Sequence, residues 1–531
     1  MSYEITDRTL IDELCTDIRT IVEKNLEELK KSFESFENLQ HSPDDNSDNL
    51  KQPINLPEDF QHPLDDEIIG TSGKLRELLT GEETAISYTK ADKLDQIWRI
   101  LLNKSIMCLR YFDKREPFLA NPSKAIVAYG IDKLEEYHKR YTEFEGLMYG
   151  ASAYYRDHVF HAIRVWMLGM FCLLKPIDEK EAFISQLVLD GGAEAPETIN
   201  FLEYISMWTI IALCHDLGYP LEKAEQILDK TRKMMKEFVP NPNVWNNFGY
   251  SGTQDSINEY ILKFISTKMK EDPCLEAQGE QEDAKEKKYV GRIQPKYYLK
   301  YAKSLENFQH GIISTAIIFK MLLYFLESDF NMNDDYIYSK EDARQFYIRR
   351  EILRAMASHT CPDAYNIHIT TFSSLLFLCD ELQEWGRKTW NELYTGLNEN
   401  SVQLTIDKFS CDVVEVTETI NMENIEDSNI IIQNICRVFE RQYSLYKTTF
   451  RDGQHTYKRD FDLKKTMTYK LKKDGSAIRT IEVVYGLPKS EASYFQVNLS
   501  SAGAKQKKDF YKKEIEDNIS KKLYGKDLSF N

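Results

Sequence analysis

The sequence predicts a mainly α protein, in which an all-helical core is joined to a smaller C-terminal α+β domain. Two observations predict this fold class. Between residues 150 and 398, apolar residues recur in stretches that are long enough for buried helices. After residue 399, short segments alternate apolar and polar residues, as half-buried strands do. We therefore expect three parts, at residues 1–149, 150–398 and 399–531.

In the first part, residues 1–149, the sequence predicts helices that are separated by a linker. Residues 7–40 carry apolar side chains at helical spacing with Glu and Lys between them, which indicates one amphipathic helix. The polar segment 41–63 contains four prolines and no periodicity, so we expect a linker over 41–66. The helical pattern resumes at residues 90–112 and 122–148.

In the second part, residues 150–398, each of the most apolar stretches predicts one helix, and two insertions lie between these stretches. Residues 236–253 are rich in Pro, Asn and Gly, and residues 268–288 are highly charged, so both segments indicate loops. The helices are expected at residues 159–174, 201–214, 308–326, 350–357 and 369–382.

The last part predicts strands and one helix. Residues 464–473 (KKTMTYKLKK) are locally basic, and we expect them to form a solvated face or to contact a regulatory anion. A helix is expected over residues 426–449. Strands are expected at residues 402–406, 413–416, 478–485 and 494–499.

Charge and cysteine content limit the classes of partner and compartment. The 68 basic and 85 acidic residues give a net charge of −17, which disfavours duplex nucleic acid but allows a small nucleotide in a local basic pocket. The nine cysteines form no CxxC pair, and this is typical of a reducing compartment. The N-terminus has no signal pattern, and the most apolar stretch, 165–174, is too short to cross a membrane. We expect a cytoplasmic protein outside the membrane.

Histidines cluster in the core. Six of the ten histidines fall between residues 158 and 368. His215 and Asp216 are adjacent after an apolar run, and Gly218 and Pro220 can end that helix. A vicinal pair at a helix end can converge on metals, because the imidazole can bind one ion while the carboxylate bridges two. Such ligands suit Fe, Mn, Zn, Ni or Co better than Ca.

Other residues of the core share this setting. His161 lies three residues after His158, so both side chains occupy one face of a helix. His310 opens an apolar helix and His359 closes one. Asp380 interrupts an apolar run, where a carboxylate is costly unless it is ion-paired or bound to a metal. Each histidine alone is more commonly structural, and only the ordered set points to a metal site.

This ordered set resembles the HD-domain phosphohydrolase superfamily over about residues 150–395. The resemblance rests on His161 in HAIRV, on His215-Asp216 in CHDLGYP and on Asp380 in FLCDELQEW. It implies a helical metal site that hydrolyses phosphate esters or anhydrides, most often in nucleotides.

The resemblance also implies a ligand set. His161, His215, Asp216 and Asp380 would hold a first metal ion. His310 and His359 match the positions that hold a second ion in two-metal members, with Asp216 bridging. The cofactor would be one or two divalent ions, drawn from Mn, Fe, Co, Ni, Zn and Mg.

The same resemblance implies candidate catalytic and substrate-binding residues. Asp216, His310 and His359 would act at the reacting phosphate, and His158 could serve as a general acid or base. Phosphoryl oxygens need cationic neighbours. Each candidate cation is more commonly a surface charge than a substrate ligand, and Arg387 could instead pair with Asp380. The candidates near the motifs are Arg156, Arg164, Lys223 and Arg387.

No subfamily of the superfamily matches in every respect. HDLG at 215–218 is similar to the deoxynucleotide triphosphohydrolases, although these usually have histidine where this chain has Tyr219. His310 or His359 would then take the catalytic place. The GYP at 218–220 directly follows the HD dipeptide, so it is not the GYP signature of cyclic-di-nucleotide phosphodiesterases.

The favoured function is hydrolysis of a (deoxy)nucleoside triphosphate, and antiviral defence is one role that the resemblance allows. One alternative is a cyclic nucleotide or cyclic oligonucleotide phosphodiesterase. Another is a degenerate HD module that binds a nucleotide and signals through the C-terminal domain. The expected partner is a small nucleotide substrate, and a homo-oligomer and a nucleotide effector are further partners to test.

Overall fold

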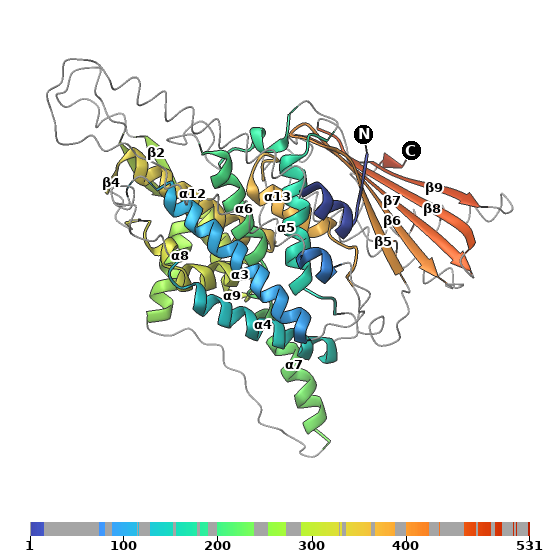
Figure 1. Cartoon of the computed structure of the whole chain (residues 1–531), viewed down its shortest axis with the longest axis horizontal. Helices are drawn as coiled ribbons and strands as arrows, with labels where there is room; N and C mark the ends of the chain where they lie inside the picture. The colour runs from blue at the N-terminus through green and yellow to red at the C-terminus, as the bar shows by residue number, and fades with distance from the viewer. Residues whose placement is uncertain are drawn as a thin grey trace.

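The fold was analysed in a computed structural model of the 531-residue chain. The protein is mainly α, with a helical body beside a fan of long strands (Figure 1). The structure describes residues 2–14, 74–79, 88–113, 115, 128–151, 155–177, 181–189, 199–237, 253–271, 288–328, 330–331, 336–362, 367–387, 400–423, 435, 461–473, 476–489, 494–501, 513, 517 and 529–530.

The helical body is organised around α6 (Phe201–Cys214), which packs against α3, α5, α12 and α13. Its sequence is apolar on all sides, as expected of a helix that is surrounded by others. The remaining helices are α3 (Tyr88–Tyr111), α4 (Ile131–Ala151), α5 (Val159–Leu174), η2 (Phe183–Gln186), α7 (Tyr219–Met235), α8 (Thr253–Ser266), α9 (Pro295–Glu306), α10 (His310–Met321), α11 (Leu323–Leu326), α12 (Lys340–His359) and α13 (Phe372–Leu382).

Local signals explain where α6 starts and how closely it packs. The Asn200 side chain caps its N-terminus by accepting the Glu203 N–H. The Glu203 carboxylate accepts the Asn200 N–H in turn, which completes a capping box. Trp208 of α6 lies against Gly169 of α5, where a Cβ would stand 1.9 Å from the indole ring. The Trp208 indole N–H donates to the Trp166 carbonyl oxygen at 3.0 Å. The apolar stretches 159–174 and 201–214 are therefore confirmed as helices, with α5 and α6 pressed together.

The core also contains strands where an all-helical structure was expected. An antiparallel sheet is formed by β2 (Thr267–Glu271), β3 (Tyr289–Ile293) and β4 (Ile337–Tyr338). Strand β2 lies at the start of the charged segment 268–288, and its Thr267 and Met269 are buried. Side chains of α12 bond to this strand, since Tyr347 donates to the Met269 carbonyl and Arg350 to that of Thr267.

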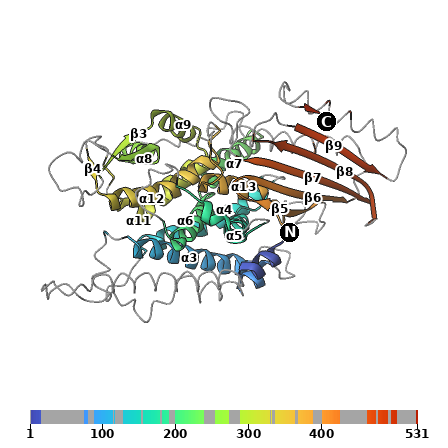
Figure 2. The ribbon, with the colours of Figure 1, turned by 90° about the horizontal axis from the view of Figure 1, so that it is seen from above.

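The second part of the fold is a mixed seven-stranded sheet in the order β1-β5-β6-β7-β8-β9-β10 (Figure 2). The four predicted strands correspond to β5, β6, β8 and β9. The basic stretch 464–473 belongs to β7, whose alternate residues are buried. The strand bounds are β1 (Tyr3–Ile5), β5 (Asn400–Phe409), β6 (Val413–Glu423), β7 (Asp462–Lys473), β8 (Ser476–Leu487), β9 (Tyr494–Ser501) and β10 (Ser529–Phe530).

The N-terminal residues join the two parts of the fold. Strand β1 pairs with β5 at the edge of the large sheet, and residues 7–14 form a helix directly after it. The rest of the predicted helix 7–40, the linker 41–66 and, apart from Ile435, the predicted helix 426–449 lie outside the described residues. The predicted helix 122–148 corresponds to α4, which begins at Ile131.

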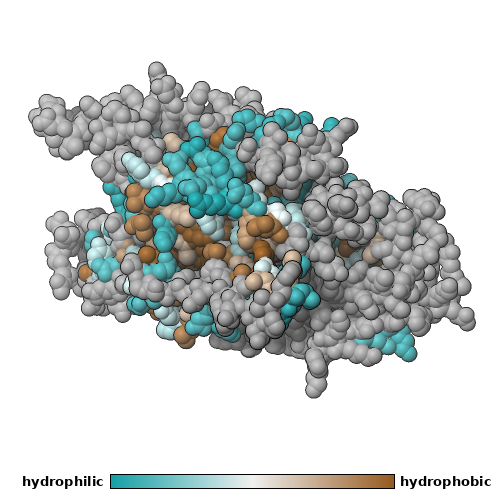
Figure 3. Space-filling model, turned by 90° about the horizontal axis from the view of Figure 1, so that it is seen from below, coloured by the Kyte–Doolittle hydropathy of each residue, from teal (hydrophilic) through white to brown (hydrophobic). Residues whose placement is uncertain are grey.

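The surface of the helical body carries exposed apolar side chains. Seen from below, brown apolar patches lie between teal polar ones (Figure 3). Among the described residues, the most exposed large apolar side chains are Met234 of α7, Leu299 of α9 and Leu147 of α4. The expected homo-oligomer stays a prediction. Within the same residues, no helix combines the length and apolar character that a membrane crossing requires.

Candidate metal centre

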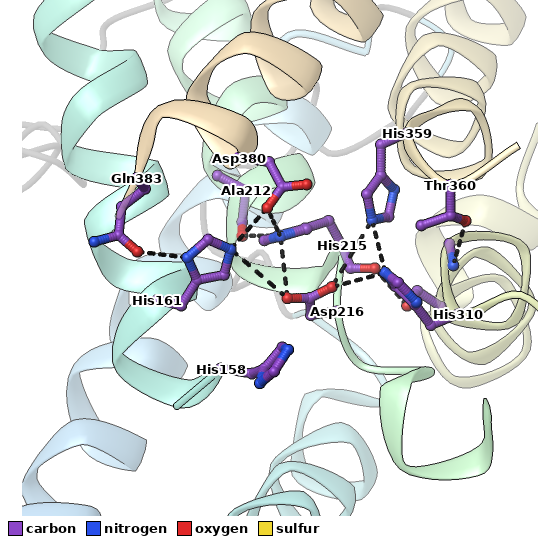
Figure 4. Close-up of polar contacts among 12 residues, drawn as sticks. His158, His161, Ala212, His215, Asp216, His310, His359, Thr360, Asp380 and Gln383 are labelled. Atoms are coloured by element: carbon purple, nitrogen blue, oxygen red, sulfur yellow. Dashed lines mark hydrogen bonds and ion pairs between the residues drawn. The ribbon is translucent and has the colours of Figure 1, made fainter. Parts of the chain in front are cut away.

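The six side chains that were expected to bind metal converge on one point in the helical body (Figure 4). They come from five helices or helix ends: α5, the residues after α6, the start of α10, the end of α12, and α13. Three overlapping groups of three have ligand atoms within 4.8 Å of one another. Four of the six residues are at most 9% exposed, and the site is therefore largely closed to solvent. The six are His161, His215, Asp216, His310, His359 and Asp380.

Close backbone packing brings these helices together. A Cβ on Gly218 would lie 2.4 Å from the His310 carbonyl oxygen, and one on Gly311 would lie 2.4 Å from that of Met356. Ser314 of α10 donates to the His215 carbonyl at 2.6 Å and accepts from the Gly218 N–H at 2.8 Å. Helix α10 therefore contacts both the turn after α6 and the end of α12, because glycine leaves room at each crossing.

Two of the four histidines are oriented by backbone carbonyls. His215 Nδ1 lies 2.8 Å from the Ala212 carbonyl oxygen, and His359 Nδ1 lies 2.6 Å from that of Met356. A carbonyl oxygen can only accept, so each Nδ1 carries the proton. In the neutral ring, Nε2 is then left with a lone pair.

The other two histidines are oriented by side chains. His310 Nδ1 lies 2.6 Å from Glu222 Oε2, and a carboxylate oxygen again accepts. His161 Nδ1 lies 2.5 Å from Gln383 Oε1. The Gln383 amide orientation is fixed because its nitrogen donates to the Trp385 carbonyl at 2.7 Å. In its neutral form, each of the four rings would therefore offer an Nε2 lone pair, and an acceptor on the other ring nitrogen is typical of metal-binding histidines.

The four Nε2 atoms surround two carboxylates. Asp216 divides its oxygens, since Oδ2 is 3.3 Å from His215 and 3.9 Å from His161, while Oδ1 is 3.1 Å from His310 and 3.8 Å from His359. Asp380 Oδ1 is 2.8 Å from His161 Nε2. Asp216 therefore faces two pairs of histidines, as a bridging carboxylate does.

When the four rings are neutral, this arrangement has many acceptors and few donors. The Nε2 atoms of His310 and His359 lie 3.2 Å apart, where two lone pairs repel. His215 Nε2 is buried and has no hydrogen-bond partner in the described part of the chain. A cation at the centre resolves both conflicts, and nitrogen and carboxylate ligands fit a divalent transition metal. The buried His/Asp groups could therefore hold a metal ion.

Charges inside the cluster shift its pKa values strongly. Burial opposes ionisation of Asp216, but His215 and the bonds from His310 and His359 hold its pKa well below the usual range. Burial likewise opposes the charged form of His310, yet its bonds to Asp216 and Glu222 raise its pKa to about 9. The bond to His310 outweighs burial at Glu222 and lowers that pKa to about 2. Without a metal, protons supply the positive charge that these carboxylates require.

His158 lies beside the cluster. Its ring stacks on Tyr219 at 3.9 Å between centroids, and its Nδ1 is 3.1 Å from the Tyr155 hydroxyl. Burial and the nearby Arg387 guanidinium lower the pKa of His158 well below its usual value. The ring is therefore neutral at physiological pH.

The four predicted substrate-binding cations have different surroundings. Arg387 donates from Nε to the Asp157 carbonyl, next to His158. Arg156 pairs with Glu384, and Lys223 pairs with Glu222, which also holds His310.

Arg164 contacts Asp7 at 2.9 Å, Asp157 at 3.8 Å and the Gly386 carbonyl, and none of these belongs to the cluster. Trp385 also donates to Asp7. Arg164 thus joins the N-terminal helix to the end of α13.

The supporting residues Gln383 and Glu222 were not expected from sequence. Gln383 lies three residues after Asp380, so helical spacing could have placed it near the ligands. Glu222 is the acidic residue in the first turn of α7, and its contact with His310 spans 88 positions.

Comparison with protein-family models, curated proteins and solved structures finds no match for this chain.

Proposed function

We propose that the protein is a metal-dependent nucleotide phosphohydrolase of the HD-domain type, and that it acts on a (deoxy)nucleoside triphosphate. One observation carries the proposal. Four histidines, each with an acceptor on Nδ1, direct their Nε2 atoms at two carboxylates, and the buried Nε2 atom of His215 has no hydrogen-bond partner among the described residues. The order of these ligands along the chain is also the order of the superfamily's motif.

Two metal positions are consistent with the contacts. His161, His215, Asp216 and Asp380 would hold one ion, and Asp216, His310 and His359 would hold another. When bound, such an ion supplies an activated water and polarises phosphoryl oxygens. The second position has fewer protein ligands, so it would leave more room for substrate oxygens and would lose its ion more readily.

The surrounding residues support a phosphate substrate. Arg156, Lys223 and Arg387 are cations beside the cluster, and each could exchange its present partner for phosphoryl oxygens. His158 lies beside the cluster, with its ring centroid 6.1 Å from that of His161, and would be placed to move a proton. The net charge of −17 favours a small nucleotide over a polynucleotide.

The decisive experiment combines metal analysis with product chromatography. Purified protein is analysed for bound metal and is incubated with Mn, Co or Mg and a panel of NTPs, dNTPs, mixed dNTPs and cyclic nucleotides. Mixtures are included because one nucleotide can activate hydrolysis of another. The inactive comparison is His215→Ala plus Asp216→Ala, and the matched control is His368→Ala, which removes an exposed histidine outside the cluster.

The products separate the candidate functions. Release of triphosphate or pyrophosphate by wild type and by the His368 variant, absent in the double variant, supports the proposal. A linearised cyclic nucleotide would replace it with a phosphodiesterase. Protein without bound metal and without turnover would favour a degenerate module that binds a nucleotide and signals.

A further inference from the structure

A second polar network lies next to the metal centre and includes none of its six ligands. Its centre is Glu145 of α4, which is 4% exposed. Glu145 Oε1 accepts the backbone N–H groups of His158 and Val159, where α5 begins, and the hydroxyl of Tyr155 at 3.1 Å. Glu145 therefore caps α5 from a neighbouring helix, at the helix end that favours an acidic group.

The direction of each hydrogen bond in this network can be deduced. Oε1 of Glu145 receives three donors, so any proton that Glu145 carries lies on its other oxygen. The single proton of the Tyr155 hydroxyl is committed to Oε1. The Tyr155 oxygen therefore offers a lone pair to His158 Nδ1, 3.1 Å away, and Nδ1 must carry a hydrogen.

The ring of His158 is held in place as well as oriented. It forms one cluster with Tyr155 and Tyr219, whose ring centroids are 5.1 Å and 3.9 Å from its own and 6.1 Å from each other, and its plane is within 30° of parallel to both. His161 contacts it edge-on. In Figure 4 the His158 ring lies below Asp216 and His161, and no dashed line joins it to the six candidate ligands.

We propose that Glu145 and Tyr155 are positioning residues that hold His158 as its Nδ1–H tautomer, so that Nε2 offers a lone pair at the metal centre. This inference rests on the proposed function for its catalytic meaning. Nε2 would take a proton from the attacking water as the water's electron pair forms the new P–O bond. The O–H bond breaks, the N–H bond forms, and the leaving oxygen keeps the electron pair of the broken P–O bond.

The test uses Tyr155→Phe, which keeps the stacked ring and removes only the hydroxyl. The matched control is Tyr149→Phe, which changes a tyrosine that packs edge-on against Tyr155. The full-length protein is labelled with ¹⁵N-histidine, and the His158 signals are assigned by their loss in His158→Asn. The ¹⁵N shifts report which ring nitrogen carries the proton, and a purely structural role would not move them.

We expect a protonated Nδ1 in wild type and in the control, and a shift toward Nε2–H in Tyr155→Phe. With the substrate found by chromatography, kcat of Tyr155→Phe should fall by about 10-fold or more while KM and metal content stay unchanged, since a positioned acid or base contributes about 100-fold or more. Glu145→Ala should also favour Nε2–H, because the Tyr155 proton could then turn toward Nδ1.

Two results would overturn the inference: an Nε2–H tautomer in wild type, or an unchanged tautomer in Tyr155→Phe. The tautomer measurement needs no substrate. Wild type with protonated Nδ1 but no turnover of any phosphate compound would therefore support the positioning network and overturn the proposed function.

Discussion

The helical body and the large sheet both bury charged groups, but they balance them differently. In the candidate metal centre, two carboxylates face the Nε2 atoms of four histidines. In the sheet, Lys465 of β7 is fully buried and bonds to the carboxylate of Glu418 on β6, which is also buried. The pair in the sheet joins a cation to an anion within the protein, whereas the histidines and carboxylates of the candidate centre could hold a cation from outside. An unbalanced excess of buried acceptors therefore distinguishes a binding site from a structural ion pair.

The largest expected effect comes from a change in the candidate metal centre. Asp216→Asn should reduce bound metal at least tenfold and abolish turnover, because Asp216 faces all four histidines. Adding metal to metal-free wild type should also raise its unfolding free energy, by about 2.7 kcal/mol at a concentration 100 times Kd. Elemental analysis and calorimetry test both effects. Equal stabilisation of wild type and variant by metal would contradict the assignment.

The next prediction breaks the balanced pair in the sheet. Lys465→Met removes the buried cation that bonds to the Glu418 carboxylate and should cost about 3–5 kcal/mol of unfolding free energy. Replacing both residues, Lys465→Met with Glu418→Leu, should restore most of that loss, since two apolar groups need no partner. Denaturant unfolding measures both variants, and metal content should stay at the wild-type level. A double variant as unstable as the single one would refute the pairing argument.

A smaller effect concerns Glu145, beside the centre. Burial, followed by the charge of Asp157, raises its pKa to about 8 from an ordinary 4.5. The folded state therefore binds a proton more tightly than the unfolded state, and this contribution to stability is lost as pH rises from about 4.5 to 8. Between pH 5 and pH 8.5, wild type should lose at least about 1 kcal/mol more than Glu145→Gln, since one pKa unit corresponds to about 1.4 kcal/mol. Parallel pH profiles in denaturant would show that Glu145 is ionised in the folded protein.

The contrast between these regions also explains what the sequence could predict. Helices α5 and α6 were predictable because apolar residues dominate both sequences, and the clustering of the six candidate ligands was expected because each lies within or at one end of an apolar run and their order resembles that of the HD motif. Strand β7 was missed because Lys465 occupies a buried position and hides the alternation in KKTMTYKLKK. Its partner Glu418 lies 47 positions away, and no local pattern connects them.

The residues that orient the ligands were predictable only in part. Gln383 is within one helical turn of Asp380, but its role depends on a contact with His161 that spans 222 positions. Glu145 and Tyr155 carry no recognisable motif. Their importance comes from hydrogen-bond directions, which require the folded arrangement of α4 against α5.

The N-terminal segment has a mechanical consequence. Strand β1 pairs with β5 at the edge of the sheet. Two residues after β1, Asp7 forms an ion pair with Arg164 and accepts a hydrogen bond from the Trp385 indole. Arg164 follows His161 by three residues, and Trp385 follows Asp380 by five. This short segment therefore connects the edge of the sheet to α5 and to the end of α13, which carry two of the candidate metal ligands. A displacement of the sheet edge would therefore reach the helices of His161 and Asp380 through the contacts of Asp7.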